Sequence, residues 1–283
     1  MSQYIAMKVI SFINMKGGVG KTTLATNVCH YLATNENKRV LLVDIDPQFN
    51  ATQCFMSGDD YIDYCSKKRD TICNIFEPNV VKRISSVDGE IPCKERTFKD
   101  IKPLKIKDNL YILPGNLELF KIEISAQSGC VNRLHQYLTE INSIYKLDYV
   151  IIDTPPTPSI WMTSALIASD YYMIPVKADP LSLTGIDLLR SIIRQKNENF
   201  DLHVKCLGLV LMMTEEKTRV CGAARKNLET HVFWKKYLFK WEIPKSINVA
   251  EHQLNQEFIL DSGNANVKTA LSRIVNEMLS RIK

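Results

Sequence analysis

The sequence lacks the features that mark a membrane protein, a secreted protein or a preformed metal centre. No apolar run approaches the roughly 18 to 20 residues that a transmembrane helix needs, and the first residues show no signal-peptide core or cleavage site. The eight cysteines contain no C-x-x-C pair, and the five histidines show no metal-ligand spacing. We therefore expect an intracellular chain with reduced, mostly buried thiols.

A strong charge of one sign is also missing. The 283 residues include 36 basic and 31 acidic side chains, and the net charge of +5 permits an anionic partner without requiring one. No repeat or low-complexity tract is visible, so residues 1–283 are expected to form one domain, whose first strand begins too early for a preceding DNA-reading domain. The weakly periodic stretch at about 57–108 is interpreted as a helical or loop elaboration of it.

Short continuous apolar runs, in contrast, are plentiful, and they alternate with stretches of helical period. Such runs are typical of strands that are covered on both faces. The alternation predicts an α/β fold, with a doubly wound, mostly parallel sheet that carries helices on both faces. The expected strands are 9–13, 40–43, 149–152, 171–176 and 207–212, and the expected helices are 22–32, 131–144, 186–194 and 267–282.

A glycine-rich loop follows the first expected strand and leads into a helix. Its glycines let backbone amides turn inward around phosphate oxygens, Lys21 adds a positive charge at the β and γ phosphates, and the Thr22 hydroxyl can ligate magnesium. The sequence therefore predicts a nucleotide site with Mg²⁺ beside it. Its residues are Gly17, Gly18, Val19, Gly20, Lys21, Thr22 and Thr23.

The loop departs from the ordinary pattern G-x-x-x-x-G-K, because Met15 replaces a glycine and a second lysine, Lys16, precedes the glycines. The segment K-G-G-x-G-K-T-T resembles the deviant Walker A loop of the ParA/MinD superfamily of P-loop ATPases. The resemblance implies that Lys16 reaches across a dimer interface to the partner's phosphates, so that ATP binding and dimerisation are one event. A cation there would stabilise the charge that develops during phosphoryl transfer.

Two further strands end in carboxylates, which at this edge of an α/β sheet face the ligand crevice. The first, Val40-Leu41-Leu42-Val43-Asp44-Ile45-Asp46-Pro47-Gln48, is similar to the L-L-V-D-x-D-P-Q segment of ParA proteins. This resemblance implies that Asp44 positions or activates the attacking water and that Asp46 lies near the magnesium shell. The second strand ends at Asp153, which by the same resemblance is the Walker B acid that holds magnesium through water.

The base remains open between adenine and guanine. The tetrapeptide Val176-Lys177-Ala178-Asp179 looks like the T-K-x-D element by which related GTPases read guanine. It is short, and Val176 departs from the threonine of that element. ATP is therefore the favoured nucleotide, with GTP as the alternative.

Basic residues are concentrated between Thr214 and Lys245, a segment that contains eight Lys or Arg and only four Glu. ParA-type proteins bind DNA without sequence preference as ATP dimers, and two weak half-sites together reach a useful affinity. By resemblance Arg219 matches a DNA-contacting arginine and Lys245 the first arginine of an I-P-R-x-x-R segment. Asn248 replaces the second arginine, and the lysines that could compensate are Lys235, Lys236 and Lys240.

The last expected helix allows a competing interpretation. MinD-like relatives use a basic amphipathic C-terminal helix to bind membranes, but the apolar stripe within 267–282 also suits packing on the chain's own sheet. An iron-sulfur cluster, as in nitrogenase-reductase-like relatives, is not favoured, because Cys130 and Cys221 lack the glycine-flanked contexts.

The resemblance as a whole implies a ParA/Soj-type partition ATPase of the small plasmid type, cytoplasmic and associated with the nucleoid. ATP would close a homodimer, the dimer would bind nonspecific duplex DNA, and a ParB-type centromere-binding partner would stimulate hydrolysis and release. The alternatives are a MinD-like membrane-associated positioning ATPase and a regulatory ATPase of secretion or polysaccharide synthesis.

Overall fold

The computed structural model describes residues 6–77, 85–86, 89–90, 96–125, 129–179, 182–215, 218–246, 249 and 255–283. Two positions of the basic region, Glu216 and Lys217, lie outside these residues, as do Asn248 and parts of the stretch 57–108.

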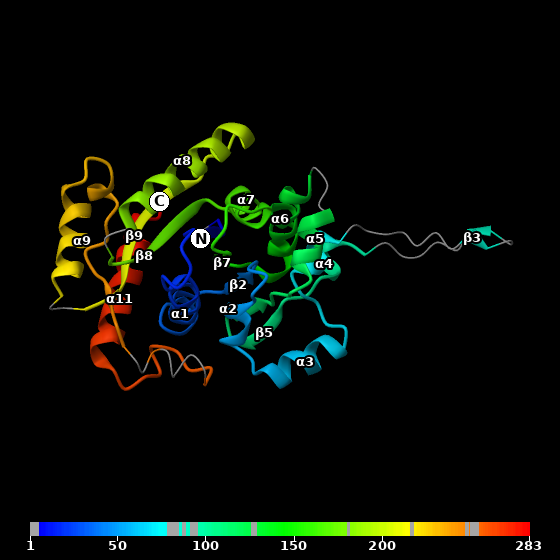
Figure 1. The fold of residues 1–283 in the computed structure, drawn as a ribbon. Helices are drawn as coiled ribbons and strands as arrows, with labels where there is room; N and C mark the ends of the chain where they lie inside the picture. Colours follow the sequence, from blue (N-terminus) through cyan, green and yellow to red (C-terminus); the bar gives the residue numbers. More distant parts are fainter. Residues whose placement is uncertain are drawn as a thin grey trace, which may run out of the picture.

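Eight strands form the main sheet (Figure 1). Every neighbouring pair is parallel except the pair at one edge, where β5 runs antiparallel to β6. The predicted doubly wound, mostly parallel fold is confirmed. In spatial order the strands are β10 (Ile243–Pro244), β9 (Lys205–Thr214), β8 (Tyr171–Lys177), β1 (Lys8–Phe12), β7 (Tyr149–Asp153), β2 (Val40–Asp44), β6 (Leu110–Leu113) and β5 (Leu104–Lys107).

Helices cover both faces of this sheet (Figure 1). Apolar side chains of the central strands alternate between the two layers, so Ile10 and Leu42 pack on the α1 side while Val9 and Leu41 pack on the α6 side. The covering helices are α1 (Lys21–Thr34) and α11 (Ala265–Arg281) on one face, and α6 (Arg133–Tyr145), α7 (Ile160–Ala168) and α8 (Ser182–Phe200) on the other.

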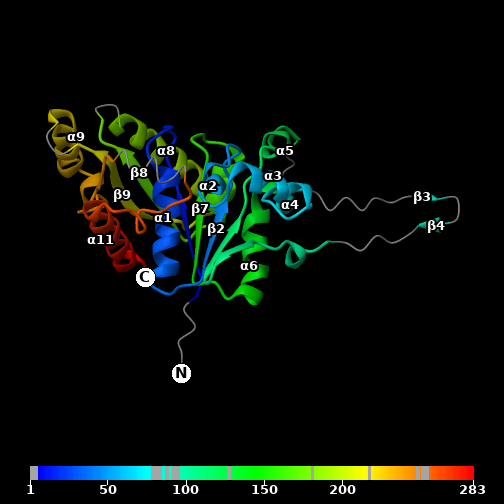
Figure 2. The same ribbon diagram turned by 90° about the horizontal axis from the view of Figure 1, so that it is seen from below.

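The sequence predicts a helical or loop elaboration at 57–108, but this stretch also contains three strands. Its last part, β5, joins the main sheet as an edge strand. A separate two-stranded hairpin lies far out from the sheet (Figure 2). The elements of the stretch are α3 (Gly58–Ser66), α4 (Cys73–Phe76), β3 (Ser85–Ser86), β4 (Gly89–Glu90), the 3₁₀ turn η1 (Phe98–Asp100) and β5.

The C-terminal helix α11 buries its apolar stripe inside the molecule. Its inward side chains pack with those of α1 and the sheet in one core cluster. Asn264 caps its first turn, because its Oδ1 accepts from the backbone N–H of Asn266 and Val267. Among the described residues, every helix is too short or too polar to cross a bilayer. The stripe of the last helix is therefore part of the core, as the packing interpretation predicts.

The order of the strands creates a crevice where the carboxyl ends of β1, β7 and β2 meet. The chain passes from β1 to β2 on one side and from β7 to β8 on the other, so the winding direction reverses here. In register, Asp153 stands beside Phe12 on one strand and Asp44 on the other. Ligands of open α/β sheets bind at such switch points.

Candidate functional site

The loop between β1 and α1 is shaped by two left-handed glycines. Gly18 has φ 67° and Gly20 φ 86°, a region that residues with a Cβ rarely adopt. Gly20 also forms the N-cap of α1 and offers no capping side chain, so the first amides of the helix remain for a ligand. Asn14 anchors the loop, since its Nδ2 donates to the Pro175 carbonyl over 2.7 Å and its Oδ1 accepts from the Lys16 N–H over 2.9 Å.

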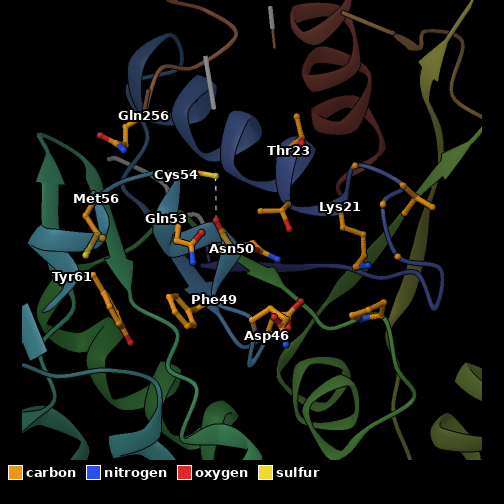
Figure 3. Close-up of a pocket in the computed structure, with 18 of the residues that line it drawn as sticks. Lys21, Thr23, Asp46, Phe49, Asn50, Gln53, Cys54, Met56, Tyr61 and Gln256 are labelled. Carbon is orange, nitrogen blue, oxygen red and sulfur yellow. Dashed lines mark hydrogen bonds between the residues drawn. The ribbon is translucent and has the colours of Figure 1, made fainter. Parts of the chain in front are cut away.

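A cavity of about 880 Å³ opens over this loop (Figure 3). On its other side lie residues that follow β2, including Asp46, Phe49 and Asn50. Three residues of α3 also line it, namely Gly58, Tyr61 and Ile62. All seven residues predicted to bind the nucleotide line it, namely Gly17, Gly18, Val19, Gly20, Lys21, Thr22 and Thr23.

Lys21 is the positive charge of the cavity. Its side chain is only 7% exposed. Burial lowers the pKa of its ammonium group, while the nearby carboxylates of Asp153 and Asp46 act in the opposite direction. A lysine held in this way gains stabilisation from an anion that reaches it, because the anion replaces lost hydration.

Thr22 and Asp153 form a pair beneath the loop. The Thr22 hydroxyl donates to Asp153 Oδ2 over 2.7 Å. Asp153 is fully buried, its Oδ1 has no hydrogen-bond partner among the described residues, and burial raises its pKa to about 7. An orphaned buried carboxylate oxygen beside a hydroxyl fits a hard divalent cation such as Mg²⁺.

The described residues contain no cluster of three or more His, Cys, Asp or Glu side chains that could cage a metal on their own. This suits Mg²⁺, which usually takes one or two carboxylates and completes its shell with water and substrate phosphates. Asp153, Thr22 and the cavity-lining Asp46 are therefore the side chains available to it.

The two aspartates of the D-x-D segment occupy different positions. Asp44 lies below the cavity wall, and its Oδ2 accepts from both the N–H and the hydroxyl of Thr52 over 2.7 Å. Burial raises the pKa of Asp44 well above the usual range, and the negative charge of Asp153 is the second cause of this shift. Asp46 lines the cavity itself, and its Oδ1 accepts from the Gln48 N–H over 2.9 Å. Burial raises the pKa of Asp46 too, and Gln48 and Lys21 oppose that shift.

Lys16 is not among the residues that line the cavity, and its ammonium group pairs with Asp179 of the same chain. The Lys16 side chain is 45% exposed and that of Asp179 21%. Asp179 is the residue that would read guanine in the GTPase interpretation, but none of Val176, Lys177, Ala178 and Asp179 lines the cavity. Its contact with Lys16 gives this carboxylate another role.

The structure divides the predicted DNA-binding residues into two groups. Arg219 begins α9 (Arg219–Thr230), near the carboxyl end of β9, and Lys245 lies beside it, since its N–H donates to the Thr214 carbonyl and its Nζ pairs with Glu215. Lys235 and Lys236 lie in the 3₁₀ turn η3 (Trp234–Lys236), roughly 18 Å away at the other end of α9.

Lys240 follows η3, and its N–H donates to the carboxylate of Glu277 on α11. All five basic side chains are exposed. The Lys236 ammonium lies over the rings of Phe233 and Tyr237, at 5.3 and 4.8 Å from their centroids. Arg219 and Lys245 therefore form the compact part of the predicted surface.

Several residues around the site were not singled out by the sequence analysis. Thr52 and Gly115 are joined, because the Gly115 N–H donates to Thr52 Oγ1 over 2.8 Å, and together they enclose Asp44. Phe49 and Tyr61 stack at the cavity wall. Thr52 and Gly115 did carry a signal, because the segments Asn50-Ala51-Thr52 and 110–115 resemble ParA segments at comparable positions. The ring pair had no such signal.

Comparison with known proteins places this geometry in a family. The profile of a family described as an AAA domain matches residues 7–206. The sporulation initiation inhibitor protein Soj of Bacillus subtilis is 31% identical over 248 residues, which cover 86% of this chain and 87% of Soj. A virulence-plasmid ParA family protein of Chlamydia psittaci is 28% identical over 258 residues, 90% of this chain and 88% of that protein.

Among solved structures, a plasmid partition protein from Borrelia burgdorferi B31 bound to AMPPNP superimposes with a TM-score of 0.77. It is 23% identical, and the match covers 97% of this chain and 99% of that one, which shows a common fold. The family profile spans the loop, both acidic strand ends and every residue of the cavity lining except Met213 and Gln256. The chain therefore belongs to the ParA/Soj-type partition ATPases of the ParA/MinD superfamily.

Proposed function

We propose that this partition ATPase hydrolyses Mg²⁺-ATP in the cavity as a homodimer and binds duplex DNA without sequence preference in its ATP state. A ParB-type centromere-binding partner would accelerate hydrolysis and so release the DNA. The observation that carries the proposal is the convergence of the phosphate loop, Lys21, Asp46 and the Thr22–Asp153 pair on one cavity.

Binding of the nucleotide follows from the loop. The amides around Gly18 and Gly20 and the first turn of α1 donate to phosphate oxygens, and Lys21 neutralises their charge. Thr22 and Asp153 would hold Mg²⁺, which would supply further neutralisation of phosphate charge. In the AMPPNP-bound relative from Borrelia burgdorferi an ATP analogue is present, which supports ATP as the ligand here.

For the hydrolytic step we assign the water-orienting role to Asp46 rather than to Asp44. Asp46 faces the cavity, whereas Asp44 Oδ2 is occupied by two hydrogen bonds from Thr52. An acceptor at the cavity wall can hold a water for attack on the γ-phosphorus, with ADP as the leaving group. Asp44 then acts through the backbone, by fixing the segment that carries Asp46.

Dimerisation would change the partner of Lys16. The ammonium group is half-exposed and pairs with Asp179 in the single chain, so it can exchange this carboxylate for phosphates presented by a second copy. The exchange places a cation against transferring phosphoryl oxygens, where it stabilises developing charge.

DNA binding by the dimer is supported by the position of Arg219 and Lys245, one exposed pair per protomer at the carboxyl end of β9. One protomer binds DNA weakly because it offers few basic residues, and two linked copies raise the effective affinity. Such a protein would reside in the cytoplasm on the nucleoid. A membrane-bound, MinD-like role receives no support from α11, because its apolar face is in the core.

The decisive experiment uses Asp46→Asn, which should bind ATP without hydrolysing it and so accumulate the dimer. The probe is a DNA duplex of about 60 base pairs with a random sequence. Its mobility should shift at low salt with ATP and not with ADP. Asp44→Asn serves as the comparison, and we expect it to lower stability rather than to trap ATP. No ATP-dependent shift with Asp46→Asn would refute the DNA-binding proposal.

A further inference from the structure

Phe49 holds a backbone conformation that bulky residues avoid. Its φ is 42° and its ψ is 35°, the left-handed region in which a Cβ crowds the following carbonyl oxygen. It precedes α2 (Asn50–Gln53) and lines the cavity three residues after Asp46. Strain of this kind persists only where the surroundings impose it, and it concentrates at functional sites.

A second aromatic ring supports this residue from outside. The Phe49 ring stacks on that of Tyr61, with centroids 4.9 Å apart and an interplanar angle of 15° (Figure 3). Tyr61 belongs to α3, and its hydroxyl donates to the Gly115 carbonyl over 2.9 Å. The stack is thereby tied to the turn that follows β6.

The same turn supports Phe49 from inside. A Cβ added to Gly115 would lie 2.7 Å from Phe49 Cβ and 2.9 Å from Asp44 Cγ, so only glycine allows this approach. Phe49 is therefore enclosed between the backbone at Gly115 and the ring of Tyr61.

The backbone at residue 49 is joined directly to Asp46. The Phe49 N–H donates to the Asp46 carbonyl over 2.8 Å, which closes a tight turn. Inside this turn the Gln48 N–H donates to the Asp46 carboxylate. Because the chain after residue 49 is held in α2, where the Thr52 N–H donates to Asp44, a change of φ at residue 49 would rotate this turn and its carboxylate relative to the phosphate loop.

We propose that Phe49 and Tyr61 are positioning residues of the ATPase, because their stack holds residue 49 left-handed and so aims Asp46 at the phosphate end of the cavity. The proposal rests on the water-orienting role proposed above for Asp46. It requires neither ring to touch the nucleotide.

A double-mutant cycle tests the stack. Tyr61→Leu should lower kcat about tenfold and change KM for ATP by less than about twofold, because binding depends on the phosphate loop. Phe49→Gly should retain kcat within about threefold, since glycine adopts a left-handed φ without support. In the Phe49→Gly background, Tyr61→Leu should cost less than about twofold. Phe49→Ala keeps a Cβ, so its left-handed φ still needs support, but it has no ring to stack on Tyr61. Its kcat should therefore fall about as far as that of Tyr61→Leu.

Tyr145→Leu is the matched control. It removes a half-buried ring that pairs with Tyr111 at 5.3 Å and lies outside the cavity lining, so kcat should not change. Binding of a fluorescent ADP analogue to each variant reports on the phosphate loop independently of hydrolysis.

Two results would overturn the proposal while leaving the role of Asp46 intact: an unchanged kcat in Tyr61→Leu, or the same loss in both backgrounds. Full kcat in Asp46→Asn would instead refute the role of Asp46, and with it the reason for positioning that residue.

Discussion

At the scale of single residues, burial controls the charge of the nucleotide site. Asp46 and Asp153 interact with the charge of Lys21, and Asp44 interacts with both of these carboxyl groups. Burial raises the pKa of all three carboxyl groups and lowers that of the lysine. These shifts show that the charged forms are poorly compensated in the free protein. A divalent cation and phosphates supply the missing partners, which is a physical reason for the site to bind both together.

The first prediction concerns the stability of the free protein and Asp153. Burial raises the pKa of Asp153 in the folded protein to about 7, above the ordinary value of about 4 for an aspartate in an unfolded chain. Its contribution to stability is therefore fully present below about pH 4 and is lost as pH rises through about 7. Asp153→Asn should therefore flatten the decline of Tm between pH 4.5 and about 7.5.

Differential scanning calorimetry across this range without nucleotide makes the measurement. Asp108→Asn, at an exposed carboxylate in the turn after β5, is the control and should keep the wild-type slope. An unchanged slope in Asp153→Asn would contradict the raised pKa.

At the scale of elements, an exposed ion pair joins two loops at the carboxyl edge of the sheet. The phosphate loop and the segment after β8 are joined by Lys16 and Asp179, which lie 163 residues apart in the sequence. An ion pair of this exposure is worth only about 0.2–1 kcal/mol, so it can break without a large penalty. Such a contact suits a residue that has one partner in the single chain and another in the dimer.

The second prediction is that Asp179→Asn strengthens ATP-dependent dimerisation. Forming one dimer breaks two such pairs, so releasing both should raise the association constant about 2- to 30-fold. Sedimentation velocity at several protein concentrations measures it. Glu198→Gln, which breaks the exposed pair with Arg194 on α8, should leave dimerisation unchanged. Equal constants for Asp179→Asn and the wild type would show that the pair does not compete with the dimer.

The third prediction concerns the start of α9. Arg219→Ala should reduce the affinity of the ATP dimer for duplex DNA and lower the slope of log K against log salt by about 1 per lost phosphate contact. ATPase activity should be spared, because Arg219 does not line the cavity. Lys236→Ala, whose ammonium rests on two aromatic rings, should have the smaller effect. Joint loss of ATPase and DNA binding would place Arg219 in the nucleotide site instead.

At the scale of the whole molecule, the C-terminal helix is hydrogen-bonded to β9, beside one edge of the sheet, and to the segment after η3. Arg281 of α11 donates to the carbonyls of Leu207, Tyr237 and Leu238, which joins the helix to β9 and the segment after η3. Gly208 allows this approach, because a Cβ there would lie 2.2 Å from the Tyr237 carbonyl oxygen. The helix is thus part of the domain that supports α9 and its basic residues.

The fourth prediction is that α11 contributes to stability and not to membrane binding. Leu271→Ala should lower the free energy of unfolding by about 2–5 kcal/mol, since the side chain is fully buried. Urea unfolding measures it, and Asn276→Ala, on the exposed face of the same helix, should change it by less than about 0.5 kcal/mol. The wild-type protein should stay in the supernatant when anionic vesicles are sedimented; co-sedimentation would revive the MinD-like interpretation.

Most central strands were predictable because their signal is local. The runs at 40–43 and 149–152 are continuous and apolar, as strands covered on both faces require, and they correspond to β2 and β7. α7 was missed, because Ile160–Ala168 is apolar on nearly every side and so has no amphipathic period. β5 was missed as an edge strand, because its alternation is only four residues long.

The phosphate loop, its lysine and the acidic strand ends were determined by the sequence itself, because phosphate binding uses adjacent backbone amides whose geometry a short run of glycines encodes. The tertiary structure decided which carboxylate faces the cavity, since Thr52 and Gly115 engage Asp44 and leave Asp46 at the wall. It also decided the pairing of Lys16 with Asp179, the stack of Phe49 on Tyr61 and the burial of α11. Each of these depends on contacts between segments that are distant in sequence, and no local pattern of residues can specify them.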